Sequence, residues 1–211
     1  MSNLAAPVRH LAHGKNRTAT DTLKGELVRK ALHLLIALVP LLASLNLEAT
    51  VALLAAGTLF YVFAERMRIA GRSVFLVSDL TVIASRDRDR GHFVVGPVTL
   101  GVGAMLALLL YPSTAAAIAV YALAFGDGLA SLAGKLVRSP RIPGTRGKTL
   151  AGSLACFLAV LASCLHLTGS PLKALLIAVA ATVLEMIPIR DFDNLILPVG
   201  TGFIAARLLG L

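Results

Sequence analysis

The 211 residues of this chain are too apolar for an ordinary soluble domain, since 57% are hydrophobic and only 15% are charged, against about a quarter charged in soluble proteins. A helix that crosses a bilayer takes ~20 mainly apolar residues, so the chain has room for about seven crossings and none for a separate soluble domain. The formal net charge of +9 would suit nucleic acid, but the distribution of that charge argues against this partner.

Residues 1–25 are polar and basic and contain no apolar stretch of the signal-peptide kind, so we expect a flexible N-terminal arm. Residues 26–211 are predicted to form a single transmembrane domain, an all-α polytopic helix bundle. The predicted spans are 31–47, 49–64, 93–111, 114–125, 149–168, 172–187 and 194–211.

Two of these segments need comment. The fourth span is short unless it continues through Gly126-Asp127-Gly128 toward residue 137. Between the second and third spans, residues 73–84 are apolar but too short to cross, and they contain Asp79. This pattern favours a helix that lies in the membrane interface.

Lysine and arginine gather on one side of the predicted bundle. With the N-terminus in the cytoplasm, six lie in the arm up to Lys30, six in the loop 65–92, five in the loop 134–148 and one at Arg190. Only Lys173 and Arg207 fall on the other side. This asymmetry predicts a cytoplasmic N-terminus and cytoplasmic loops. Topology and contact with anionic headgroups or nucleotide then explain the basic charge, and no nucleic-acid partner is expected.

Ionisable residues in or beside a membrane span cost about 2.5–3.5 kcal/mol each near a helix centre, so each is a functional candidate. The first cluster is Glu26, Arg29, Lys30 and His33, whose spacing puts all four on one helix face. Such a face can hold a phosphate while its own charges stay paired. The alternative is a juxtamembrane anchor whose cations reach the headgroups, but His33 lies one turn deeper, where an anchor is not needed.

The second cluster is Gly126-Asp127-Gly128, followed by Ser131, Gly134 and Lys135. Glycines let the backbone leave helical geometry and let a ligand approach closely. Asp127 would suit a magnesium ion bound to nucleotide phosphates, or it would take a proton from an attacking hydroxyl. The alternative is a helix C-cap followed by an N-cap aspartate.

The third cluster covers residues 144–149, Gly-Thr-Arg-Gly-Lys-Thr. It is similar to the end of a phosphate-binding P-loop, but that motif requires glycine where this chain has Ile142, and no strand precedes it. What remains is a basic loop, with Arg146 and Gly147, that ends in Lys148-Thr149 at the start of a helix. A helix N-terminus with a lysine beside it attracts phosphate.

The fourth cluster joins two predicted spans. Glu185 lies about one turn inside its span, and Asp193-Asn194 opens the last helix. One interpretation is a helix cap together with a Glu185–Arg190 ion pair. The other is a set of carboxylates that completes a metal or nucleotide site, and the sequence leaves both open.

Taken in order, the four clusters resemble the polyprenol/phytol/dolichol kinase family, which includes CTP-dependent diacylglycerol kinase. The resemblance covers about residues 25–210, and its last element is most similar to the phytol kinase branch. The matching elements are Arg29-Lys30-x-x-His33, Gly126-Asp127-Gly128-Leu129-Ala130-Ser131-Leu132-Ala133-Gly134, Gly147-Lys148-Thr149-Leu150-Ala151-Gly152-Ser153, and Glu185-x-x-Pro188 with Asp193-Asn194-x-x-x-Pro198.

The resemblance implies transfer of the terminal phosphate of CTP, or of ATP, to a lipid alcohol such as phytol, polyprenol, dolichol or diacylglycerol, with Mg²⁺ as cofactor. The basic loop after Asp127 would bind the nucleotide. The predicted catalytic residues are Asp127, Lys148, Arg29, Lys30, His33 and Glu185. The predicted nucleotide-binding residues are Gly126, Gly128, Ser131, Gly134, Lys135, Arg146, Gly147 and Thr149, and the predicted metal ligands are Asp127, Glu185 and Asp193.

Two other functions remain open at this point. A CTP:phosphatidate cytidylyltransferase would use the same reactants but attack the α-phosphorus and form a CDP-lipid. A non-enzymatic transporter or lipid-binding scaffold is disfavoured, because the polar groups crowd one interface and no internal repeat is visible. We expect a multi-pass membrane protein with its site on the cytoplasmic face, in a bacterial inner membrane, and the acceptor and oligomeric state stay open.

Overall fold

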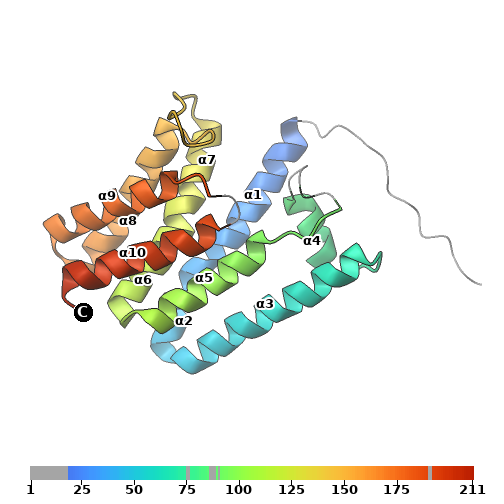
Figure 1. Cartoon of the computed structure of the whole chain (residues 1–211), viewed down its shortest axis with the longest axis horizontal. Helices are drawn as coiled ribbons and strands as arrows, with labels where there is room; N and C mark the ends of the chain where they lie inside the picture. The colour runs from blue at the N-terminus through green and yellow to red at the C-terminus, as the bar shows by residue number, and fades with distance from the viewer. Residues whose placement is uncertain (1–18, 75–76, 86–88, 90, 190–191) are drawn as a thin grey trace, which may run out of the picture.

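The computed structural model describes residues 19–74, 77–85, 89, 91–189 and 192–211. All regular elements in these ranges are helical (Figure 1), and the only β-type pairing among them is an isolated bridge between Arg141 and Thr149. The predicted all-α class is therefore confirmed for this part of the chain. In chain order the elements are α1 (Ala19–Leu35), the 3₁₀ turn η1 (Ile36–Leu38), α2 (Val39–Leu45), α3 (Leu47–Ile69), α4 (Val77–Ala84), α5 (Gly96–Leu110), α6 (Ser113–Tyr121), the π-helical segment η3 (Ala122–Asp127), α7 (Gly128–Leu136), α8 (Leu150–Thr168), α9 (Pro171–Met186) and α10 (Asp193–Leu209).

The described residues contain four helical stretches that are long and apolar enough to cross a bilayer: Lys24–Leu45, Leu47–Ile69, Ser113–Leu136 and Leu150–Thr168. Three further predicted spans correspond to shorter helices, α5 with 15 residues, α9 with 16 and α10 with 17. Membrane association is thus supported by length and composition. Seven crossings and a cytoplasmic N-terminus stay predictions.

The first span is longer than predicted and is made of three elements. α1 begins at Ala19, inside the segment predicted as an arm, while residues 1–18 lie outside the described part. The helix tightens into η1 just before Pro40, whose missing N–H cannot bond to the Ile36 carbonyl one turn earlier. The early start places Glu26 and Lys30 on the helix, as their spacing predicts.

The predicted fourth span also runs through three elements, α6, η3 and α7. Gly126-Asp127-Gly128 does not end a helix, because Asp127 keeps helical dihedrals (φ −70°, ψ −36°) and its side chain caps nothing. The interpretation as a C-cap followed by an N-cap aspartate is therefore wrong. The backbone instead widens into the π-helical segment η3, a local irregularity that is frequent at functional sites.

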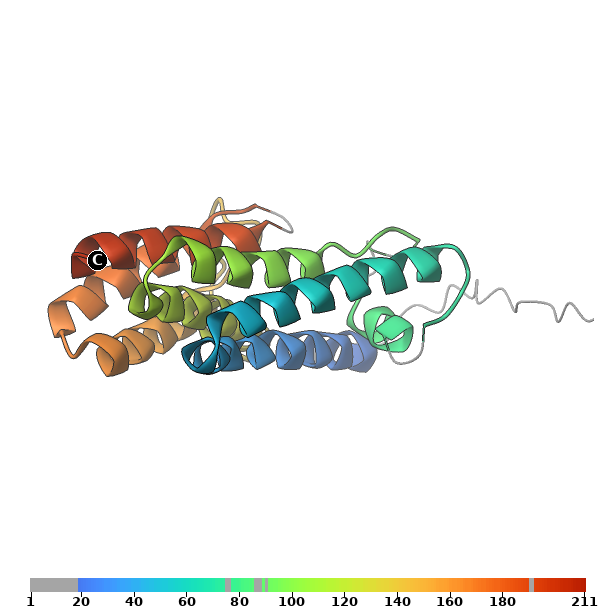
Figure 2. The same ribbon diagram turned by 90° about the horizontal axis from the view of Figure 1, so that it is seen from below.

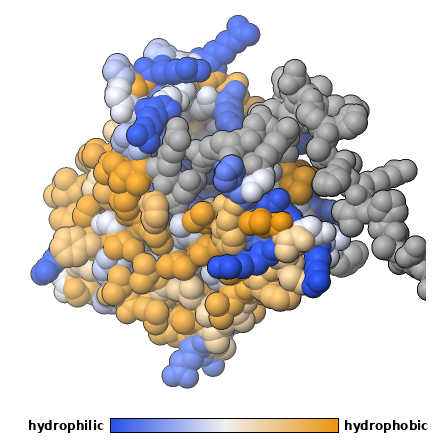
Figure 3. Space-filling view, turned by 45° about the vertical axis from the view of Figure 1, so that its right-hand side comes forward, coloured by the Kyte–Doolittle hydropathy of each residue, from blue (hydrophilic) through white to orange (hydrophobic). Residues whose placement is uncertain are grey.

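Small side chains hold the bundle together, as expected where lipid removes the hydrophobic drive between helices. The core between α6, α8, α9 and α10 contains Ala115, Cys156, Ala174, Ala181 and Ala205, all buried. Large apolar side chains face outward. Figure 3 shows hydrophobic residues across the middle of one face and hydrophilic residues gathered mainly at its upper and lower ends.

The short helix α4 packs against α1 and α3. The long helices run along a common direction, whereas α4 lies across them and is seen nearly end-on in Figure 2. Leu80, Val82 and Ile83 are exposed while Ser78 and Thr81 are buried. This distribution fits the interfacial helix predicted over residues 73–84; residues 75–76, 86–88 and 90 of the predicted loop 65–92 lie outside the described part.

The close approach of α7 and α8 leads to a first prediction. A methyl group on Gly152 would lie 2.8 Å from the Ala130 carbonyl oxygen, a backbone atom that cannot rotate away. We expect Gly152→Ala to destabilise the protein by about 1–3 kcal/mol, measured as a lower thermal unfolding midpoint in detergent. The matched control is Gly57→Ala in α3, where the new methyl group meets nothing within 4 Å. Equal midpoints for the two variants would contradict the prediction.

Candidate active site

The predicted site residues meet in a cavity of about 950 Å³ at one end of the bundle. Its polar wall is formed by α1, α7, the loop between α7 and α8, the end of α9 and the start of α10. Of the predicted residues, all line this cavity except Gly126 and Gly128. The four sequence clusters therefore form one site.

Gly126 and Gly128 serve helix packing instead. A methyl group on Gly126 would lie 3.2 Å from Val160 Cγ2 and 3.3 Å from Cys156 Sγ on α8. On Gly128 it would lie 3.3 Å from Leu34 Cδ2 on α1. Their small size lets α1 and α8 approach the segment that carries Asp127, and their role in nucleotide binding stays a prediction.

Asp127 is the centre of a buried ion pair. Lys30 Nζ donates a hydrogen bond to Asp127 Oδ2 at 2.6 Å, and His33 Nε2 lies 3.2 Å from the same oxygen. His33 also donates from Nε2 to the carbonyl oxygen of Leu123 at 2.7 Å. Because Leu123 belongs to η3, the widened turn supplies the acceptor that orients the imidazole. All three ionisable side chains are buried.

Glu26 and Arg29 connect the same face of α1 to two other helices. The Glu26 carboxylate pairs with Arg29 on α1 and with Lys135 on α7. Arg29 Nη1 also donates to the carbonyl oxygen of Ala84 at 3.3 Å, at the C-terminus of α4. Although it belongs to the first cluster, Glu26 was not predicted as a site residue. Its spacing of three residues from Arg29 was the signal for this role.

Lys148 pairs with Glu185, which brings the loop before α8 onto the end of α9. Burial would lower the pKa of the Lys148 ammonium, but the neighbouring Glu185 carboxylate raises that pKa above the ordinary lysine value. Lys148 is therefore a permanent cation near neutral pH. The alternative Glu185–Arg190 pair involves a residue outside the described part.

Two buried oxygens of the cavity wall have no hydrogen-bond partner among the described residues: Glu185 Oε2 and Ser153 Oγ. A buried polar atom left unsatisfied costs ~1–3 kcal/mol, so such atoms mark places where a ligand group or water binds. Glu185 is the ion-pair partner of Lys148, and Ser153 lies near the start of α8, just after Lys148 in the chain. Both oxygens therefore belong to the Lys148 part of the cavity.

The carboxylates of the cavity fit a magnesium ion that is completed by a ligand. Asp193 lines the cavity and its carboxylate is repelled by that of Asp127, a repulsion that a cation would relieve. No group of three His, Cys, Asp or Glu side chains in the described ranges forms a ready metal site. Magnesium commonly takes only one or two carboxylates beside phosphate oxygens and water. Asp127 with Glu185 or Asp193 would suffice.

The loop between α7 and α8 has a defined, strained backbone. The Arg141–Thr149 bridge closes it, and Ile142 N donates to the Lys148 carbonyl oxygen at 2.8 Å. Arg146 has a left-handed φ of 54°, which costs a residue with a side chain ~1–2 kcal/mol. Strain of this kind gathers at ligand sites. It holds Arg146 beside Lys148 in the cavity wall.

The expectation that the N-terminus of α8 binds phosphate is wrong in its detail. The first N–H groups of the helix already have acceptors: Leu150 N donates to Pro140 O at 3.0 Å, Ala151 N to Ser139 Oγ at 3.1 Å, and Gly152 N to Thr149 Oγ1 at 3.2 Å. These N–H groups are therefore not free, and the cationic groups that this loop brings to the cavity wall are the side chains of Lys148 and Arg146.

Glu65 of α3, which is 1% exposed, is a further buried carboxylate that was not predicted as a site residue. Arg68 donates two hydrogen bonds to it, each at 2.7 Å, and the backbone N–H of Val94 donates a third at 2.8 Å. The Tyr61 hydroxyl donates to the Val94 carbonyl at 3.0 Å. Glu65 was taken as the start of a loop, and only its spacing to Arg68 could have indicated a role.

Comparison with known proteins gives the family. No family model and no solved structure matches the chain. It is similar to the chloroplastic farnesol kinase of Arabidopsis thaliana, with 30% identity over 190 residues that cover 80% of this chain and 61% of that protein. It is also similar to probable chloroplastic phytol kinases of Zea mays, 26% identical over 161 residues (68% of this chain, 53% of that protein), and of Triticum aestivum, 27% identical over 168 residues (70% and 56%). These homologues, named phytol kinase and farnesol kinase, support a polyprenol/phytol kinase family for this chain.

The resemblance drawn from the four motifs is thereby confirmed. The chain spans between 53% and 61% of the length of these curated relatives. Because these kinases are chloroplastic plant proteins, the predicted bacterial inner membrane finds no support.

Proposed function

We propose that this protein transfers the terminal phosphate of a nucleoside triphosphate, CTP or ATP, to the hydroxyl of an isoprenoid alcohol. The observation that carries this proposal is a cavity in which three lysine–carboxylate pairs, Lys30–Asp127, Lys135–Glu26 and Lys148–Glu185, share space with an apolar wall. Phosphoryl transfer needs cations around the migrating group and in-line positioning rather than covalent help from the protein. The names of the relatives, phytol kinase and farnesol kinase, favour an isoprenoid acceptor.

The cations of the cavity would contact two different parts of the nucleoside triphosphate. Lys148 and Arg146, on the strained loop, would bind the triphosphate, with Lys135 nearby on α7. Lys30 and Arg29 on α1 would face the phosphoryl group in transfer. Charged hydrogen bonds of this kind are about twice as strong as neutral ones, which suits them to phosphate oxygens.

The carboxylates and His33 keep these cations in place. Both contacts of Asp127 use Oδ2, so Oδ1 is the oxygen through which Asp127 would meet a magnesium ion or the acceptor hydroxyl. Glu185 orients Lys148. His33, which is held by the Leu123 carbonyl, lies against the same Asp127 oxygen that accepts from Lys30. A bound magnesium ion would supply neutralisation of charge on the phosphate oxygens.

The test is an assay with γ-labelled CTP or ATP, magnesium and a panel of farnesol, phytol, polyprenol, dolichol and diacylglycerol, with the full chain in detergent. We expect label in an isoprenyl monophosphate. Label in pyrophosphate beside an unlabelled CDP-lipid would establish a cytidylyltransferase instead. A non-enzymatic scaffold would transfer no label and gain no thermal stability, whereas a bound nucleotide at 100 times its Kd adds about 2.7 kcal/mol.

A further inference from the structure

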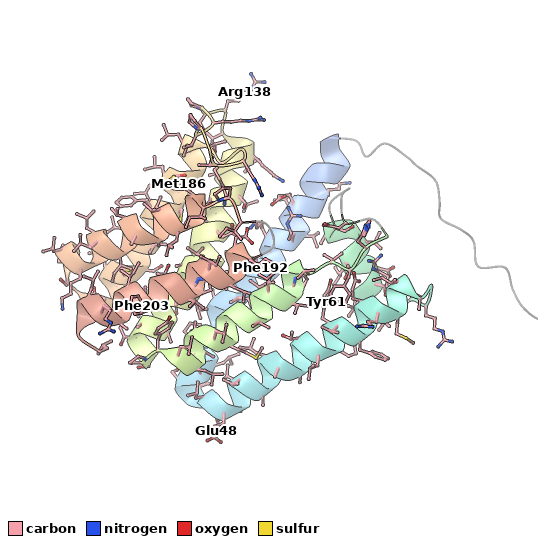
Figure 4. All side chains as sticks on the ribbon, viewed as in Figure 1. Glu48, Tyr61, Arg138, Met186, Phe192 and Phe203 are labelled. Carbon is pink, nitrogen blue, oxygen red and sulfur yellow. The ribbon has the colours of Figure 1, made fainter. Side chains whose placement is uncertain are left out.

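Part of the cavity lining is apolar, and this apolar wall comes from four helices and the segment before α5. It includes Leu32 of α1, Tyr61 of α3, Leu80 of α4, Phe93 before α5 and Leu100 of α5. Figure 4 shows Tyr61 on α3, near the start of α5. A cavity with one charged and one apolar wall matches an amphiphile whose polar end reacts and whose remainder is hydrocarbon.

Side chains of α3 hold the segment before α5 in position. Both backbone polar groups of Val94 are bonded to side chains of α3, its N–H to Glu65 and its carbonyl to Tyr61. Arg68 binds Glu65 and also donates to the His92 carbonyl at 2.9 Å. The Tyr61 ring meets the Phe93 ring edge to face, with centroids 6.5 Å apart. A buried carboxylate in an apolar helix is costly, and this one fixes part of the apolar wall.

α4 separates part of the apolar wall from the outside of the bundle. Its last carbonyl accepts a hydrogen bond from Arg29, a residue of the charged cluster. Leu80 lines the cavity, whereas Val82 and Ile83 of the same helix are exposed and do not line it. A hydrocarbon chain that leaves the cavity beside α4 therefore passes directly from protein to lipid.

We propose that this apolar wall binds the hydroxyl-proximal isoprene units of the acceptor, and that Glu65 is a positioning residue that sets the shape of the wall through Val94. The inference rests on the proposed function, because it takes an isoprenoid alcohol as the occupant. The acceptor hydroxyl lies toward Lys30 and Asp127, and the rest of the chain extends beside α4 into the bilayer.

The first test places a larger side chain in the apolar wall and so narrows the cavity beside it. Leu100→Phe is expected to raise the KM for farnesol and phytol roughly tenfold, in the range that one misfitting group in an apolar pocket causes, and to leave the KM for nucleotide unchanged. The matched control is Leu109→Phe on the same helix, where the side chain is 62% exposed; it should behave as the unmodified protein does. An unchanged acceptor KM in Leu100→Phe, or an equal rise in both KM values, would overturn the proposal.

The second test addresses Glu65. Glu65→Gln keeps the size of the side chain but weakens the Arg68 pair, so we expect the acceptor KM to rise roughly fivefold or more while kcat and the nucleotide KM change little. Glu48→Gln, at the other end of α3, is the control. A fall in kcat and in thermal stability with no change in acceptor KM would show that the role of Glu65 is only structural and would refute its role in acceptor positioning.

A binding measurement separates this inference from the proposed function. A farnesol analogue with a photoreactive group near its hydroxyl should label peptides that contain residues 77–84 and 92–100. Such labelling in a protein that phosphorylates no alcohol would retain the site and refute the kinase. Phosphorylation together with labelling confined to outward-facing residues would retain the kinase and refute the site.

Discussion

Replacement of Asp127 by asparagine is expected to lower kcat by about 10²–10⁴-fold, the range for loss of a group that takes part directly in proton or charge transfer. The amide keeps the size of the side chain but removes the negative charge that holds Lys30 and faces His33. It also removes the oxygen charge through which a magnesium ion would be held. The buried Lys30 ammonium would then lie against a neutral group.

The measurement is kcat at saturating nucleotide and acceptor, together with the thermal midpoint. Glu48→Gln is the matched control, since Glu48 is an exposed carboxylate that Figure 4 places at the opposite end of the molecule from Arg138. The double variant Lys30→Met/Asp127→Asn restores charge balance and should recover stability without recovering kcat. Recovery of both would show that Asp127 serves only to neutralise Lys30.

Lys148→Met is expected to lower kcat/KM for the nucleotide by roughly 10²–10³-fold, comparable to loss of one preorganised donor to a developing charge. The first N–H groups of α8 are already bonded, so no backbone group replaces this ammonium. Glu185→Gln should cost less because the cation remains but is less well oriented. The effects of the two variants should be non-additive in the double variant, because they belong to one pair.

The pH profile of nucleotide affinity provides a second readout for Lys148. Its pKa is raised above the ordinary lysine value by Glu185. The contribution of the charged form is therefore complete below the ordinary lysine pKa of about 10.4 and is lost only as pH rises through the higher folded value. Affinity limited by Lys148 should stay flat to about pH 10. The control is Lys173→Met, at a residue that does not line the cavity. An equal loss of nucleotide affinity in Lys148→Met and Lys173→Met would refute the assignment of Lys148 to the nucleotide.

Helical periodicity made part of the site predictable. Arg29, Lys30 and His33 recur on one face of a helix, and the structure shows Lys30 and His33 on the same carboxylate oxygen. The order of the motifs led to the correct family. Which helix carries the partner of each charge was not predictable, because the pairs Lys135–Glu26 and Lys148–Glu185 join residues far apart in the sequence.

Other features depend on details that a linear pattern does not contain. A glycine that lets a ligand approach and a glycine that lets a helix approach look alike in sequence, so the packing of Gly126 against α8 and of Gly128 against α1 was not predictable. The acceptors that occupy the N-terminus of α8 come from Ser139 and Pro140, and only the folded loop brings them there. Glu65 was missed because α3 continues to Ile69, beyond the predicted end of its span.

As predicted membrane spans, the three shorter helices of the bundle would have a consequence for the surrounding membrane. At 1.5 Å per residue, the 15 residues of α5, the 16 of α9 and the 17 of α10 measure about 23 to 26 Å, against a hydrocarbon thickness of ~30 Å. A bilayer adapts to such hydrophobic mismatch by thinning locally. One end of each of these helices lies at the cavity, so the headgroup plane should dip where the cavity opens. An alcohol anchored by its hydroxyl at that plane would then reach the depth of Lys30 with its tail still dissolved in lipid.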